Sequence, residues 1–176
     1  MKYFQKLVLP VLLLTISMVL LEGCNPLGYT ARSQCRPGVE TVCVPMWTRG
    51  TNVYRRNSEI QLTEAIVKCI ELNTTYKVTN KGKADTILTG TITSIEQKSL
   101  GVNPDTDTPR GLMVRFTVSF RWKDLRTGKE ILSEDDFTVT EVYHPSAPYN
   151  EEFFRGSKSL MEKMARRIVE KMNADW

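Results

Sequence analysis

Cys24 is the residue whose type and surroundings most directly indicate chemistry. It follows Leu21-Glu22-Gly23, and a leucine three residues before a cysteine, with a small residue directly before it, is typical of a bacterial lipobox. Two lysines near the start and an uncharged apolar run over 7–21 have the form of an export signal. That run is shorter than the about 20 residues that cross a bilayer. We therefore predict that Cys24 accepts a diacylglycerol on its thiol.

Two neighbours of Cys24 bear on this prediction. Glu22 departs from the small or uncharged residues usual at its position, and the alternative is a secreted protein in which Cys24 is incidental. Asn25 stands where an aspartate usually signals retention at the inner membrane, so it favours the outer membrane. Acyl chains such as palmitate would supply the membrane attachment. The predicted segments are a signal peptide over 1–23, a lipidated cysteine and tether over 24–38, and a single domain over 39–176.

The remaining residues offer little for catalysis or metal binding. The one histidine, His144, precedes Pro145, and no nucleophile motif surrounds the nearby Ser146. Asp105 and Asp107 lack the other ligands of a calcium loop, and no Cys/His spacing is typical of zinc. The formal net charge of +4 comes without a dense Lys/Arg run. We therefore expect no enzymatic activity, no metal, no cofactor and no nucleic-acid partner.

Three further cysteines follow Cys24. Cys35 and Cys43 could form a disulfide in an oxidising compartment, a question that the sequence leaves open. Cys69 falls among apolar residues at helical spacing, and we expect it to act as a small buried hydrophobe. An odd number of cysteines cannot all pair within one chain.

The clearest structural pattern is the strict alternation of apolar and polar residues over 112–122. Period two predicts a strand with one buried and one polar face. Composition predicts further strands over 39–47, 85–96 and 131–143, with Gly90 at a bulge or a close approach of another segment.

Two helices complete the predicted domain. Apolar residues recur at three- and four-residue steps after Ser58, which forms a capping box with Gln61. A second helix is predicted from Asn150, a suitable cap, to the C-terminus. Residues 48–57 and 98–111 are expected to be loops, the longer one functional or mobile. This order predicts an α+β fold, with two helices packed on one face of a mainly antiparallel sheet of about four strands.

Six segments then suggest a family by their order and spacing: Gly28-Tyr29-Thr30-Ala31-Arg32, PGVETVCVPMW (37–47), EIQLTEAIVKCIE (59–71), ADTILTGTITSIEQ (84–97), VSFRWKDLRTGKEIL (118–132) and ARRIVEKMNADW (165–176). Together with the lipobox they resemble the LptE family of lipopolysaccharide-assembly lipoproteins. The resemblance implies an outer-membrane lipoprotein, facing the periplasm, that plugs an LptD-type β-barrel, assists its folding and helps to deliver lipopolysaccharide. The alternative is a generic periplasm-facing lipoprotein that scaffolds another envelope component.

Basic residues are the candidates for contact with these partners. Arg115, Arg121 and Lys123 share the polar face of the strand over 112–122, and Arg110 lies just before it. Cations spaced along one sheet face could bind lipid A phosphates, to which arginine offers bidentate donors. The alternative is a solvated face that keeps the sheet soluble. The candidates for contact with a protein partner are Arg49, Arg55 and Arg56.

Overall fold

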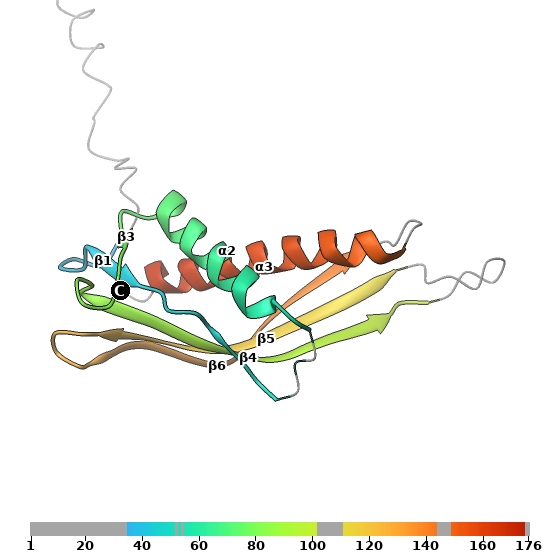
Figure 1. Ribbon diagram of the computed structural model, residues 1–176, viewed down its shortest axis with the longest axis horizontal. Coiled ribbons are helices and arrows are strands. Elements are labelled where there is room, and N and C mark those ends of the chain that lie inside the picture. The colour runs from blue at the N-terminus through green and yellow to red at the C-terminus, as the bar shows by residue number, and fades with distance from the viewer. Residues whose placement is uncertain (1–34, 52, 54, 102–110, 144–148, 175–176) are drawn as a thin grey trace, which may run out of the picture. The chain divides into compact units, whose positions relative to one another are not determined.

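The computed structural model describes residues 35–51, 53, 55–101, 111–143 and 149–174, all within one unit, Ser33–Trp176 (Figure 1). Side chains of the last helix are described from 158 to 173. In chain order, these residues form β1 (Thr41–Cys43), β2 (Thr48–Arg49), α2 (Ser58–Asn73), β3 (Lys77–Val78), β4 (Thr86–Ser99), β5 (Leu112–Asp124), β6 (Glu130–Tyr143) and α3 (Tyr149–Ala174). None of the described helices is long and apolar enough to cross a membrane.

The sheet of the described chain is mixed and has six strands, which corrects the prediction of about four mainly antiparallel strands. Its order is β3-β1-β4-β5-β6, with β2 also paired to β4. The long strands β4, β5 and β6 form the antiparallel part. β1, β2 and β3 pair in parallel, β3 with β1 and the other two with β4. These strands have only two or three residues each, too few to show a period in the sequence.

The predicted first strand over 39–47 and the predicted loop over 48–57 therefore both needed correction. Regular pairing in the first ends at Cys43, and pairing resumes with β2 inside the predicted loop. β1 and β2 lie beside successive parts of β4, at Thr86–Ile87 and at Thr91–Ile92. The chain leaves the sheet between them and then pairs again with the same strand. The positions of β1 and β2 therefore depend on backbone pairing with β4 and not on a local sequence pattern.

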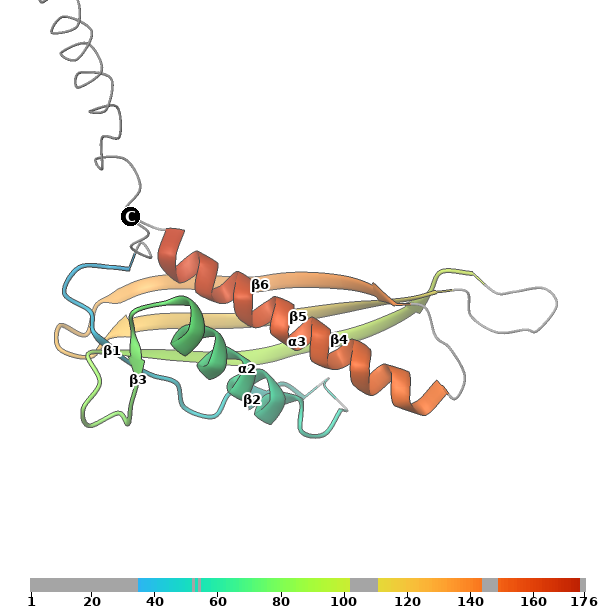
Figure 2. The ribbon, with the colours of Figure 1, turned by 90° about the horizontal axis from the view of Figure 1, so that it is seen from above.

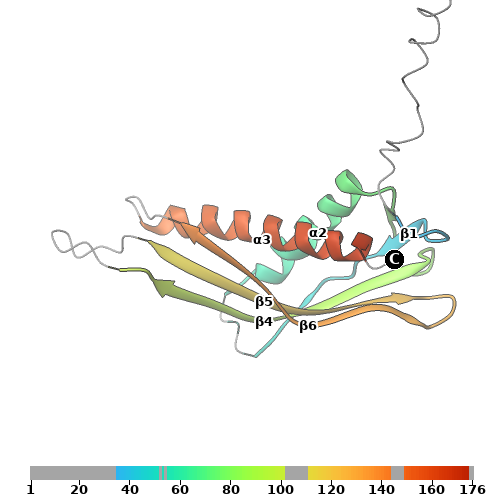
Figure 3. The same cartoon turned by 180° about the vertical axis from the view of Figure 1, so that it is seen from behind.

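Both helices lie on one face of the sheet, as predicted, and none of the described helices covers the other face (Figures 1 and 3). α3 crosses the long strands obliquely, and α2 lies beside it (Figure 2). The α+β class is therefore confirmed. The helix-free surface of β4, β5 and β6 is called the open face below.

The alternation in β5 is also confirmed, and it builds the core. Its five core residues are each at most 3% exposed: Val114, Phe116, Val118, Phe120 and Trp122. They face the apolar stripes of the two helices, where Ile66 of α2 and Met164 of α3 are fully buried. Burial of one such side chain contributes roughly 1.5–3 kcal/mol. This shared core fixes which face of β5 points to solvent.

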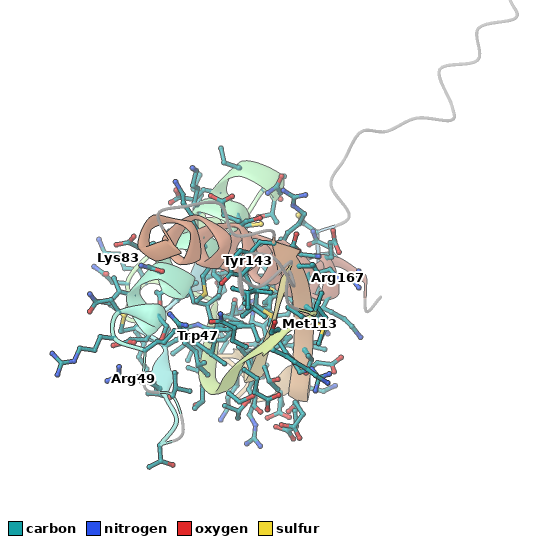
Figure 4. The ribbon with its side chains drawn as sticks, turned by 90° about the vertical axis from the view of Figure 1, so that its right-hand side faces the viewer. Trp47, Arg49, Lys83, Met113, Tyr143 and Arg167 are labelled. Carbon is teal, nitrogen blue, oxygen red and sulfur yellow. The ribbon has the colours of Figure 1, made fainter. Side chains whose placement is uncertain are left out.

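Gly90 marks a close approach, as predicted. A Cβ atom placed on Gly90 would lie only 2.4 Å from Cζ3 of Trp47. Trp47 is 2% exposed, and its ring stacks beside Phe120 with centroids 6.4 Å apart. Trp47 lies between the helices and the sheet, whereas Arg49 lies at the periphery (Figure 4). The missing side chain of Gly90 thus makes room for the indole between β1 and β2.

The two predicted helix caps are wrong. The residue before α2 is Asn57, whose backbone is left-handed at φ 65°, and none of the described side chains caps this helix. Ser58 is already helical, so its hydroxyl donates back to the carbonyl of Arg55 at 3.1 Å. α3 begins at Tyr149, so Asn150 lies inside the helix and does not precede it.

The cysteines of the described chain behave as side chains of the fold. No disulfide joins Cys35 to Cys43, although both lie within the described residues. Cys43 is buried, and the backbone N–H of Thr75 donates to the Cys35 sulfur at 3.4 Å. Cys69 is half-buried and packs against the core, where burial raises the pKa of its thiol.

Candidate functional site

The open face brings together three of the predicted basic residues. Arg115, Arg121 and Lys123 are exposed and alternate along β5 with core residues. β5 is paired on both sides, to β4 and to β6, over nearly its whole length. The three cations are therefore held on a central, rigid strand. The fourth candidate, Arg110, lies outside the described residues, as do Cys24, Asp105, Asp107 and His144.

Arg115 is partly neutralised by its neighbour across the ladder. Glu96 of β4 lies directly opposite, and its carboxylate is 3.7 Å from the Arg115 guanidinium. Both side chains are more than half exposed, at 52% and 63%. An exposed pair of this kind contributes only about 0–1 kcal/mol to stability. Its main effect here is to place a negative charge beside one of the three cations.

Arg121 pairs with no acidic residue, since it faces Ser133 across the β5–β6 ladder, whereas Lys123 faces Glu130 there. Across the β4–β5 ladder the two cations face Thr89 and Ile87. No carboxylate among the described residues lies within salt-bridge distance of either cation. Alternate residues on one strand face lie about 7 Å apart. The open face thus carries two adjacent cations that form no ion pair with the described residues, although Glu130 lies opposite Lys123 on β6. Two phosphate oxygens or two phosphate groups could bind there.

Arg49 and Arg55 are bound to this protein's own chain. The Arg49 Nη1 donates to the backbone carbonyl of Arg55 at 3.0 Å, and its Nε lies 4.0 Å from the Glu59 carboxylate. Arg55 Nη2 donates to Gln97 Oε1 of β4 at 3.1 Å, and burial lowers the pKa of its guanidinium. These contacts fasten the N-terminus of α2 to the sheet. Arg56 is exposed.

Two lysines of α3 have a role that the sequence did not reveal. Lys163 donates to the Glu141 carboxylate and, at 3.0 Å, to the carbonyl of Thr140. Lys171 donates to the Glu134 carboxylate at 2.8 Å. Both glutamates lie on the helix side of β6, opposite the core residues of β5. These contacts hold α3 along the edge strand.

A β-bulge makes this arrangement possible. Glu134 and Glu141 are seven residues apart, and an odd spacing in a regular strand places side chains on opposite faces. The register of β6 shifts between the partners of Val118 and Phe120, where Asp136 adopts a left-handed φ of 54°. The extra residue reverses the alternation, so both glutamates point to α3. In the sequence, the signal for these contacts was the presence of two glutamates in one predicted strand together with several lysines in the last helix.

A groove of about 530 Å³ opens between α2 and α3, away from the open face. Its apolar lining includes Leu72 and Met161. Its charged lining combines both signs: Glu64, Lys68, Lys158, Glu162 and Arg166. This mixture does not select an anion. In the described part of the chain, no three His, Cys, Asp or Glu residues gather as metal ligands.

Comparison with known proteins identifies the family. The model of the LptE family, described as lipopolysaccharide-assembly, matches residues 39–175. Solved structures with a similar fold include rare lipoprotein B from Shewanella oneidensis, with 18% identity, a TM-score of 0.52 and coverage of 76% of this chain and 93% of that one.

Two further solved structures share this fold. Uncharacterized lipoprotein B from Nitrosomonas europaea has 17% identity and a TM-score of 0.51, over 86% of this chain and 95% of that one. The hypothetical protein CT253 from Chlamydia trachomatis has 12% identity and a TM-score of 0.57, over 78% and 97%. No curated protein matches the sequence. Because the family model covers more than half of the sequence, this chain belongs to the LptE lipopolysaccharide-assembly family.

Proposed function

We propose that this protein is an outer-membrane lipoprotein that binds lipopolysaccharide through its open face and serves as the plug and folding partner of an LptD-type β-barrel. Family membership supports the general role. The observation that carries the binding site is that Arg121 and Lys123, adjacent on a helix-free face, form no ion pair with any described carboxylate. We propose no enzymatic step, because binding and orientation account for every candidate residue.

The chemistry of the proposed site is phosphate binding by a preformed array of cations. The Arg121 guanidinium offers two parallel N–H donors to one phosphate, and the Lys123 ammonium adds a point charge beside it. Both side chains are exposed, so a phosphate reaches them without opening the core. Arg115 contributes less, because Glu96 already engages it. Arg110 is proposed to extend the same row of cations.

The test is charge reversal of the pair. Arg121→Glu with Lys123→Glu is expected to weaken lipopolysaccharide binding by roughly tenfold or more, because charged hydrogen bonds contribute about 1.5–3 kcal/mol each. Stability should fall by no more than about 1 kcal/mol: both side chains are exposed, and the main cost is that Lys123→Glu sets a carboxylate opposite Glu130 of β6. The measurement is the affinity of the purified protein for lipopolysaccharide, with the thermal midpoint recorded alongside.

Two controls sharpen this test. Lys68→Glu with Arg166→Glu makes the same change in net charge in the groove between the helices. Arg115→Glu reverses the cation that already has a carboxylate partner, and it should weaken binding less than Arg121→Glu. Equal losses in the groove variant and the open-face variant would show that only net charge matters and would contradict the proposed site.

The barrel partnership has its own test. Purification of the tagged lipoprotein from detergent-solubilised outer membrane is expected to recover a large β-barrel protein in a stable complex. Arg56, exposed in the loop before α2, is the proposed contact from that loop, together with Arg49 and Arg55. Arg56→Glu is expected to lower the barrel recovered, whereas Lys68→Glu is the matched control. Recovery of no barrel would favour an envelope scaffold with another partner.

A further inference from the structure

Two turns are fastened together at one end of the sheet. They are residues 79–85, between β3 and β4, and residues 125–129, between β5 and β6. The N–H of Leu125 donates to the carbonyl of Asp85 at 2.8 Å, and the Arg126 guanidinium lies 3.7 Å from the Asp85 carboxylate. The turn between β5 and β6 lies at the same end of the sheet as β1 and β3 (Figures 1 and 2). The two turns thus form one continuous surface.

The described chain also begins at this end. Arg126 donates to the carbonyl of Gly38 at 2.6 Å, and the Tyr76 hydroxyl accepts from the N–H of Arg36 at 2.7 Å. Cys35 follows Cys24 by 11 residues. An extended chain of that length spans at most about 40 Å. An acyl anchor at Cys24 would therefore keep this end of the sheet close to a membrane surface.

Exposed lysines gather at the same end. They are called the basic end here: Lys77, Lys81, Lys83, Lys123 and Lys129. None of the five has a carboxylate within salt-bridge distance among the residues that the structure describes. Three of them, Lys81, Lys83 and Lys129, lie in the two turns. Their charges are thus directed to solvent.

The carboxylates near the basic end are mostly engaged by the protein. Asp85 accepts hydrogen bonds from the backbone N–H groups of Glu40 and Thr41, and the former contributes most to lowering the pKa of its carboxyl. The N–H of Thr127 contributes most to the lowered pKa of Asp124, which also lies 4.0 Å from Arg126. Only Glu40 and Glu130 remain as exposed acids of the described residues around these turns. The lysines outnumber them, so the surface is positive.

We propose that the basic end rests on anionic phospholipid headgroups of the membrane that holds the acyl anchor. The occupant follows from charge complementarity and from the short tether between Cys24 and Cys35, so the proposal rests on the predicted lipidation of Cys24. The diacylglycerol predicted on Cys24 supplies the anchor, and basic residues at the surface supply a second, electrostatic contact. Each lysine near an anionic surface strengthens binding about fivefold. This contact would also orient the domain, with the turns toward the membrane.

The test uses the full mature chain with Cys24→Ser, so that acyl chains do not mask the weaker contact. Binding is measured by co-sedimentation with vesicles of phosphatidylcholine mixed with phosphatidylglycerol, and with vesicles of phosphatidylcholine alone. The protein is expected to bind the anionic vesicles and to leave them as salt rises, because the interaction is screened within about 8 Å at physiological ionic strength. Equal binding to both kinds of vesicle would overturn the proposal.

The decisive variant replaces three lysines of the turns. Lys81→Gln, Lys83→Gln and Lys129→Gln together are expected to lower the vesicle affinity roughly a hundredfold, from about fivefold for each. The corresponding three Lys→Arg changes should retain binding. The matched control is Lys68→Gln, Lys158→Gln and Arg166→Gln, which removes the same charge from the groove between the helices. An equal fall in that control would overturn the proposal.

These vesicles contain neither lipopolysaccharide nor a barrel, so the result is independent of the proposed function. Loss of lipopolysaccharide binding on charge reversal of Arg121 would not alter the effect of the turn lysines. Conversely, a turn variant that binds vesicles normally but recovers less barrel would show that the basic end faces a protein, and would overturn the phospholipid proposal.

Discussion

Gly90→Ala is expected to lower the free energy of unfolding by roughly 3 kcal/mol, because overpacking a core and losing a large buried side chain each cost amounts of this order. The new Cβ would lie 2.4, 2.5 and 2.6 Å from Cζ3, Cη2 and Cε3 of Trp47. The indole must therefore leave its site, and with it the stacking on Phe120. The thermal midpoint should fall by roughly 10 °C. Urea unfolding of the purified domain measures the change.

A double-mutant cycle tests the assigned cause. In a Trp47→Ala background, Gly90→Ala should cost almost nothing, since the clashing ring is absent. Gly82→Ala is the matched control: no atom lies within 4 Å of a Cβ built there, so its stability should be close to that of the unaltered protein. The same loss from Gly90→Ala with and without the indole would contradict the clash and indicate a backbone effect.

The mature chain with Cys24→Ser, exported behind a signal peptide that is cleaved without lipidation, is expected almost completely in the soluble periplasmic fraction and not in the membrane fraction. Each acyl methylene buried in a bilayer contributes roughly 0.8 kcal/mol, so loss of whole acyl chains exceeds the effect of any other single replacement in this chain. The basic end alone should retain only a small, salt-sensitive fraction. Cell fractionation and the mass of the N-terminal peptide measure the result.

Cys35→Ser is the control for this prediction. It removes a cysteine that is half-buried within the described domain, and it should leave the protein in the membrane fraction. An unaltered protein already in the soluble fraction, with an unmodified N-terminal peptide, would instead show a secreted protein in which Cys24 is incidental. The lipid anchor and the placement of the basic end would then both be wrong.

Local patterns predicted the long elements because those elements are repetitive. β5 has a strict period of two, and the structure buries Phe116, Phe120 and Trp122 while leaving Arg115 and Arg121 exposed. That period alone brought the basic residues of the candidate site to one face. The apolar stripe of α2 was equally predictable, since Leu62, Ile66 and Ile70 recur every four residues. The structure buries all three completely.

Short elements were not predictable in this way. β2 and β3 have two residues each. They are strands because their backbones pair with β4 and β1, respectively, and so short a segment shows no period of its own. The helix caps failed for a related reason. The left-handed backbone of Asn57 makes it the residue that precedes the helix. The side-chain types of Ser58 and Gln61, on which the predicted cap was based, do not indicate that backbone angle.

The charge balance of the candidate site was likewise a tertiary property. The sequence does not distinguish Arg115, Arg121 and Lys123. The register of the neighbouring strands sets Glu96 in salt-bridge range of Arg115 and leaves Arg121 between Thr89 and Ser133. Lys123 lies between Ile87 and Glu130, without an ion pair to the described residues. The bulge at Asp136 similarly turns Glu134 and Glu141 to the same side, where α3 lysines engage them.

The amino-acid order alone thus specified the three long strands, the two helices and the polar face of β5, because each follows from a period within one segment. Three features depend on contacts between segments far apart in sequence: which cations form ion pairs, how α3 is held on β6, and which turns meet at the basic end. Arg126 and Asp85 show the reason: 41 residues separate them in the chain, and only the pairing of β4 with β5 places their charges 3.7 Å apart.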